Sequence, residues 1–123
     1  MIIAVDFDGT LFEKRVPYDG RVGKPILDII NVVKLAKRLG HKIMIFTCRS
    51  AKKNGRKYAI NALKKYNIPY DAFNKEVVNN CDGVYFDIKS VTKPAFDLLI
   101  DDKAAGWLGP KLIGKILRKQ LNG

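Results

Sequence analysis

Apolar residues in this chain form short continuous runs and longer segments with helical spacing. The runs Ile2–Phe7 and Lys42–Phe46 are rich in β-branched residues and end at polar or turn residues, which predicts two buried strands. Between them, the segment from Pro25 to Gly40 repeats apolar residues every three or four positions. Proline suits a first helical turn and glycine a helix end, so we predict a helix there. Its apolar positions are Ile26, Ile29, Ile30, Val33 and Leu39.

The second half of the chain continues this alternation. We predict a helix over about 55–66, a short strand over 70–74, a buried strand over 97–100 and a final amphipathic helix over 112–121. Residues 75–92 fit no single element, although Val84–Ile88 suits an extra strand or one arm of a hairpin. Residues 12–24 contain one proline and two glycines and are expected to form a loop.

Strands that are apolar throughout and alternate with helices predict a parallel sheet with helices on both faces. We therefore expect an open, doubly wound α/β fold with three layers, α/β/α. A chain of 123 residues without repeats or linkers is expected to form one domain, residues 1–123.

Charge is the unusual feature of the composition. The chain has 23 basic and 12 acidic residues, a formal net charge of +11, which favours polyanionic partners such as nucleic acid, nucleotides or anionic lipid surfaces. A lysine-rich solvated surface fits the composition equally well. No run approaches the roughly 20 apolar residues of a membrane span, and the N-terminus lacks a signal-peptide pattern, so we expect a cytoplasmic protein without a membrane partner.

Polar residues stand where the predicted strands end. Asp6 and Asp8 end the first strand, Thr47 follows the second, and Asp101 and Asp102 follow the last. Because parallel α/β sheets bind ligands outside the carboxyl ends of their strands, these side chains are expected to converge. Clustered aspartate oxygens suit Mg²⁺, most of all where a phosphate completes the coordination.

Two residues after Asp8 suit a phosphate-binding turn. Gly9 permits a sharp turn and close backbone approach, and Thr10 is suited to capping the next segment. Simpler interpretations exist for the acids: Asp6 and Asp8 as turn caps, and Asp101 with Asp102 as a strand-to-turn pair. The basic residues after Thr47 suit either a phosphate-attracting collar or a solvated surface. These are Arg49, Lys52, Lys53, Arg56 and Lys57.

The order of these motifs resembles the haloacid dehalogenase superfamily of phosphohydrolases. The residues are DFDGTLF, then an apolar strand ending in Thr, then Lys93 before an apolar strand ending in Asp-Asp, and the match spans Ile2 to about Gly106. The stretches FTCRS (46–50), NIPYD (67–71) and KPAFDLLIDDKA (93–104) are similar to a small cap-less group from bacteria and phages. The resemblance implies a single Rossmann-like domain.

The resemblance also implies a role for each matching residue. Asp6 would be the nucleophile that forms an aspartyl-phosphate, and Asp8 the general acid and base. Thr47 would bond a phosphoryl oxygen, and Lys93 would neutralise charge, with Lys89, Arg49 and Lys52 as competitors for that role. Asp101 would bind Mg²⁺ with Asp6 and the Asp8 carbonyl, and Asp102 would be either a further ligand or a residue that supports the ligands. Gly9, Thr10 and Arg49 would contact substrate. Two neighbouring carboxylates, here Asp6 and Asp8, cannot both ionise freely, so one pKa is expected to rise.

These features together predict a Mg²⁺-dependent phosphatase. The chain leaves no room for a cap domain, so we expect an open site that admits a large substrate or is shielded by a second subunit. The basic charge favours nucleotides or nucleic-acid termini as substrates. The alternative is a basic nucleic-acid-binding or regulatory protein on the same scaffold with little turnover.

Overall fold

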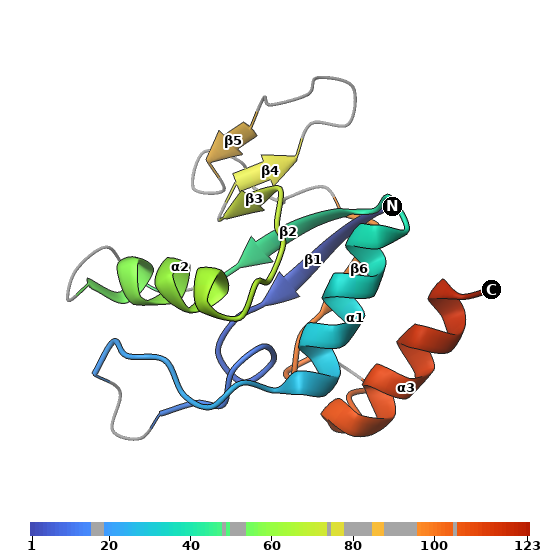
Figure 1. The fold of residues 1–123 in the computed structure, drawn as a ribbon, viewed down its shortest axis with the longest axis horizontal. Helices are drawn as coiled ribbons and strands as arrows, with labels where there is room; N and C mark the ends of the chain where they lie inside the picture. Colours follow the sequence, from blue (N-terminus) through green and yellow to red (C-terminus); the bar gives the residue numbers. More distant parts are fainter. Residues whose placement is uncertain are drawn as a thin grey trace.

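The computed structural model describes residues 1–15, 19–47, 49, 54–73, 75–77, 85–87, 96–104 and 106–123. Four parallel strands form the main sheet in the order β3-β2-β1-β6 (Figure 1). They are β1 (Ile2–Asp6), β2 (Lys42–Phe46), β3 (Ala72–Phe73) and β6 (Leu98–Ile100). The helices are α1 (Leu27–Arg38), α2 (Gly55–Lys65) and α3 (Pro110–Leu121). This arrangement confirms the predicted Rossmann-like α/β fold with a parallel sheet.

The central strand β1 is apolar on both faces because both faces are covered. Ile3 and Val5 join a large core with the helices, whereas Ile2 and Ala4 join a smaller cluster on the opposite face. All four side chains are at most 3% exposed. Burial of side chains of this size contributes about 1.5–3 kcal/mol each for the larger ones, so β1 anchors the sheet.

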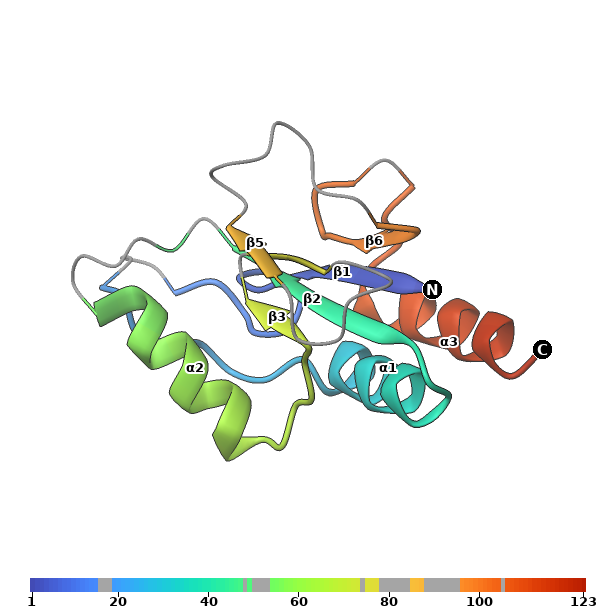
Figure 2. The same cartoon turned by 90° about the horizontal axis from the view of Figure 1, so that it is seen from above.

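The described helices all lie on one face of the sheet, which corrects the prediction of a helix layer on each face (Figure 2). Buried residues of α1, α2 and α3 belong to the same core cluster. Right-handed crossovers explain the positions of α1 and α2, because β1, β2 and β3 follow one another in a single direction across the sheet. The chain then returns past β1 to β6, and the described part of that return contains no helix.

The described part of the return contains the hairpin alternative predicted for residues 75–92. Strand β4 (Lys75–Val77) pairs antiparallel with β5 (Tyr85–Asp87) in a separate two-stranded sheet. Strand β6 differs from its prediction as a buried strand, because Leu99 is 37% exposed. The reason is strand order: within the described residues, β6 lies at the edge of the main sheet and has β1 as its one neighbour. None of the described helices is both long and apolar enough to span a bilayer.

Candidate functional site

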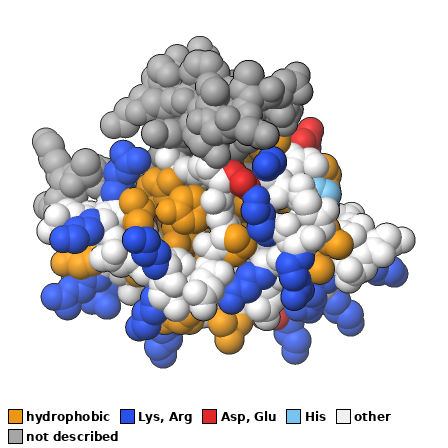
Figure 3. All heavy atoms as spheres, turned by 45° about the horizontal axis from the view of Figure 1, so that its top comes forward, with side chains coloured by type: hydrophobic (Ala, Val, Ile, Leu, Met, Phe, Trp, Pro, Cys, Tyr) orange, Lys and Arg blue, Asp and Glu red, His pale blue; other side chains and the backbone are white. Residues whose placement is uncertain are grey.

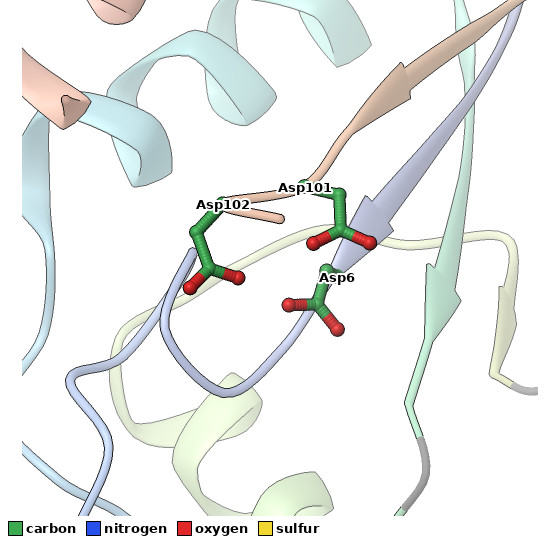
Figure 4. Close-up of side chains that lie close together, drawn as sticks. All are labelled: Asp6, Asp101 and Asp102. Atoms are coloured by element: carbon green, nitrogen blue, oxygen red, sulfur yellow. The ribbon is translucent and has the colours of Figure 1, made fainter. Parts of the chain in front are cut away.

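Three carboxylates meet at the carboxyl edge of the sheet (Figure 4). Asp6 is the last residue of β1, and Asp101 and Asp102 directly follow β6, which is the neighbouring strand. One carboxylate oxygen from each residue lies within 4.8 Å of the others. The sheet topology therefore brings together side chains that are 95 residues apart in the chain, as the strand-end argument predicted.

The environment of Asp6 disfavours its charged form. Burial raises the pKa of the Asp6 carboxyl to about 7, helped by the negative charges of Asp101 and Asp102 and by a hydrogen bond with Asp102. A hydrogen bond from Thr10 opposes this shift. The predicted rise in one pKa is present, but its causes are burial first and then the charges of Asp101 and Asp102, rather than the charge of Asp8. A cation bound among these oxygens would relieve the repulsion.

Thr10 links the two loops that carry the carboxylates. Its side chain is fully buried, and its hydroxyl oxygen accepts a hydrogen bond from the backbone N–H of Asp102 at 3.0 Å. The single hydroxyl proton has two possible acceptors, Asp6 Oδ2 at 3.2 Å and Asp102 Oδ1 at 3.4 Å. The structure thus places Thr10 as a bridge between Asp6 and Asp102, which lies 92 residues from Thr10 in the chain. The capping and substrate-contact interpretations missed this role.

Gly9 holds the turn against Asp102. Its φ is +90°, and a Cβ at this position would lie 2.5 Å from Asp102 Oδ2, closer than real Cβ contacts. The Gly9 N–H donates to the Phe12 carbonyl at 2.6 Å, and the N–H groups of Leu11 and Phe12 both donate to the Phe7 carbonyl. The backbone conformation therefore favours glycine, and any side chain at this position would displace the Asp102 carboxylate.

Asp8 lies apart from this group of three, with its carboxylate held by Arg49. The Arg49 Nε and Nη2 donate to the two Asp8 oxygens at 2.9 and 2.8 Å. We expected Asp6 and Asp8 to be neighbouring carboxylates at the end of one strand, but β1 ends at Asp6 and the chain turns immediately after it. The Asp8–Arg49 pair joins residues 41 positions apart, and only the proximity of Arg49 to Thr47 in the sequence could have suggested it.

The structure describes Thr47 but not Lys93, the two residues predicted to contact the phosphoryl group. Thr47 is buried at the end of β2, and its Oγ1 accepts a hydrogen bond from the Arg49 N–H at 3.2 Å. Lys93 and its competitors Lys89 and Lys52 lie outside the described residues. A basic residue that sequence reasoning did not identify, Lys14, places its Nζ 3.6 Å from Asp102 Oδ2 and is half exposed.

The proposed basic collar is only partly described. Lys52 and Lys53 are outside the described residues, and Lys57 is exposed. The Arg56 guanidinium lies 5.4 Å from the centroid of the Phe73 ring, so it packs on an aromatic face.

Solved structures share this fold over nearly the whole chain. A conserved protein from Bacteroides thetaiotaomicron has a TM-score of 0.72 and 27% identity, covering 98% of this chain and 91% of that one. A target protein from Vibrio cholerae has a TM-score of 0.50 and 25% identity, with 98% and 96% covered. A chain of the Pnkp1/Rnl/Hen1 RNA repair complex, at 21% identity and a TM-score of 0.49, covers 96% of this chain and 30% of that chain, too weak a likeness to support an inference.

No protein-family model matches the chain, and no curated protein sequence gives a significant match. The similarity to the Bacteroides protein supports a Rossmann-like fold that extends across the chain.

Proposed function

We propose that this protein is a Mg²⁺-dependent phosphatase of the haloacid dehalogenase type. The observation that carries the proposal is the convergence of Asp6, Asp101 and Asp102 at the carboxyl edge of a parallel sheet. Two further features support it: the DFDGT motif that contains Asp6, and the Rossmann-like fold of the chain. Partly buried carboxylates that lie close together repel one another unless a proton or a cation neutralises them. A bound metal ion would provide that neutralisation.

The donor set of the site fits Mg²⁺. Three carboxylates offer hard oxygen ligands, and their mutual repulsion is the condition that a divalent cation relieves. Asp6, Asp101 and Asp102 would hold the ion. When bound, Mg²⁺ supplies charge neutralisation for the phosphoryl group and favours the ionised form of Asp6.

Asp6 is proposed as the nucleophile. Its carboxylate oxygen attacks the phosphorus atom, a P–O bond to Asp6 forms, and the bond to the leaving oxygen breaks. Asp8 gives a proton to that leaving oxygen. In the second half of the reaction Asp8 takes a proton from water, the water oxygen attacks phosphorus, and the Asp6–phosphate bond breaks to release inorganic phosphate. Thr47 and Lys93 are proposed to contact phosphoryl oxygens, as the resemblance implies.

Nucleotides or phosphorylated nucleic-acid ends are the proposed substrates. The net charge of +11 favours polyanions, and lysine and arginine side chains are spread over the face of the molecule drawn in Figure 3. The chain offers no segment long enough for a cap domain over the site. We also propose that the protein acts in the cytoplasm, either as a monomer or as a homo-oligomer that shields the open site.

Hydrolysis of an aryl phosphate, with and without Mg²⁺, tests the activity directly. The proposal expects Mg²⁺-dependent turnover by the wild type, lost in Asp6→Asn and retained in Asp97→Asn, a matched acid-to-amide change at the opposite edge of the sheet. Oligonucleotides with 3′- or 5′-phosphates then test the substrate class. If folded protein leaves every one of these esters intact but binds nucleic acid, the alternative of a nucleic-acid-binding or regulatory protein replaces the phosphatase.

A further inference from the structure

Arg49 is a buried arginine whose side chain makes an unusually complete set of contacts. It forms a two-pronged pair with Asp8, in which the Nε–H donates to Oδ2 at 2.9 Å and an Nη2–H to Oδ1 at 2.8 Å. The side chain of Arg49 is 2% exposed, whereas that of Asp8 is 27% exposed. The pair therefore has one end in the interior and the other at the site.

The remaining guanidinium donors bind backbone carbonyls. Nη1 donates to the carbonyls of Gly20 and Gly55, and Nη2 donates to that of Arg21 at 3.0 Å. A guanidinium has five N–H groups, and these contacts account for all of them. The Phe7 ring also lies beneath it, 5.0 Å from Cζ to the ring centroid. No guanidinium N–H is left over for a substrate phosphate, which argues against the substrate-contact role assigned to Arg49 from the sequence.

We propose that Arg49 is a positioning residue that fixes the Asp8 carboxylate for proton transfer and ties it to the loop at 20–21. This inference rests on the proposed function, in which Asp8 exchanges a proton with the leaving oxygen and with water. Arg49 occupies one lone pair on each Asp8 oxygen and leaves the second lone pair of each available for that proton. Arg49 itself stays protonated throughout.

The fork geometry of arginine is the feature that the proposal requires. Lysine keeps the positive charge but offers a single ammonium group, which cannot hold both Asp8 oxygens and three carbonyls at once. In Arg49→Lys the Asp8 carboxylate should lose its fixed orientation while the charge near the site is unchanged. The matched control is Arg38→Lys, the same substitution in the last turn of α1.

Leaving-group dependence is the kinetic readout. An alkyl phosphate needs a proton on its leaving oxygen, whereas p-nitrophenyl phosphate has a good leaving group that needs it much less. Arg49→Lys should lower kcat about 10- to 100-fold for the alkyl ester, as Asp8→Asn does, and much less for the aryl ester, with KM nearly unchanged. Because both substitutions disable the same function, proton transfer by Asp8, the kcat of the double variant should be no lower than that of Asp8→Asn. Equal loss on both esters, or a rise in KM alone, would overturn the proposal.

A spectroscopic readout works even if the wild type hydrolyses none of these esters. The Nε–H resonance of Arg49 should exchange slowly with solvent in the wild type, become fast-exchanging in Asp8→Asn, and stay unshifted when Mg²⁺ and inorganic phosphate are added. If this spectroscopic pattern is found but no ester is hydrolysed, the proposed phosphatase activity is contradicted. The proposal that Arg49 positions Asp8 would then still stand. A resonance that moves with phosphate and ignores Asp8→Asn would make Arg49 a phosphate ligand and overturn the inference.

Discussion

The two edges of the parallel sheet use the same residue type in opposite ways. At the amino edge, Asp71 and Asp97 stand just before β3 and β6, and each closes a pair of backbone hydrogen bonds with the neighbouring strand. The Asp97 N–H donates to the Ile2 carbonyl at 2.8 Å while Oδ2 accepts from the Ile2 N–H at 2.7 Å. Asp71 makes the same two contacts with Ile43, and its other oxygen accepts from Lys37 Nζ at 2.6 Å.

At the carboxyl edge the aspartates face one another. Asp6, Asp101 and Asp102 bring their oxygens within 4.8 Å. Among the described residues, the Thr10 hydroxyl is the only neutral group that donates to Asp6, and Lys14 is 3.6 Å from Asp102. Acids at the amino edge complete the backbone hydrogen bonding of the fold. At the carboxyl edge, the described part of the chain brings one cation close to the three acids, Lys14. Carboxylates that face one another and are partly buried mark the functional edge more clearly than the presence of acids alone does.

Removing the nucleophile should have the largest effect. Asp6→Asn is expected to lower turnover by about 10⁴-fold or more, because an amide cannot form the phosphorylated intermediate. Asp97→Asn keeps an oxygen that can accept from Ile2, so its turnover should stay within about 2-fold of the wild type. Steady-state hydrolysis with saturating Mg²⁺ compares them. Comparable losses in both variants would remove the distinction between the edges.

The second-largest expected difference between the two edges is in Mg²⁺ affinity. Asp101→Asn replaces a charged ligand by a neutral one and should weaken Mg²⁺ binding by about 100-fold. Asp71→Asn should leave the affinity unchanged. Calorimetric titration of each folded variant with Mg²⁺ measures this directly, and an unaltered affinity in Asp101→Asn would exclude Asp101 as a ligand.

For folding stability, substitutions at the amino edge should have the larger effect and substitutions at the carboxyl edge the smaller one. Asp97→Ala leaves the Ile2 N–H without its acceptor and should lower the free energy of unfolding by about 1–3 kcal/mol. Asp101→Ala removes a repulsive charge beside Asp6, so metal-free protein should be no less stable than wild type at pH 7. Denaturant unfolding without Mg²⁺ gives both values, and a larger loss in Asp101→Ala would contradict the comparison.

Two glycines provide the finest test of the carboxyl edge. Gly9 and Gly40 share a φ of +90°, but a Cβ at Gly40 meets nothing within 4 Å, whereas one at Gly9 meets Asp102. Alanine at either position should cost about 1–2 kcal/mol from backbone strain. Only Gly9→Ala should also weaken Mg²⁺ binding several-fold, since Asp102 must move. Equal Mg²⁺ affinities in the two variants would show that the Asp102 contact does not matter.

The sequence predicted the main elements because their signals are local. The apolar runs of β1 and β2 and the helical spacing of α1 need no knowledge of distant residues. The ends of the runs at β1 and β6 identified Asp6 and Asp101. The position of the helices on one face was not predicted, since it depends on strand order. The exposure of Leu99 depends on the same order, because an edge strand has one neighbour only.

Partners of charged groups were the weakest predictions, for a physical reason. Arg49 could face a phosphate, solvent or an acid, and nothing in FTCRS distinguishes these. The roles of Thr10 and Asp97 are equally non-local, because the groups that they bond lie 92 and 95 residues away. Lys93 lies outside the described residues, so its role stays a prediction.

The most direct test of the account is the stability of the protein against pH, with and without Mg²⁺. The raised pKa of Asp6, about 7 when folded against 3.8 unfolded, means that the folded chain holds a proton that the unfolded chain has released between these values. Metal-free stability should therefore fall as pH rises from about 4 to 7, and Asp6→Asn should remove that component of the fall. Mg²⁺ should stabilise the wild type increasingly over the same range, because it binds the ionised acids. The same pH profile in wild type and Asp6→Asn, with no stabilisation by Mg²⁺, would contradict a cation site at the carboxyl edge.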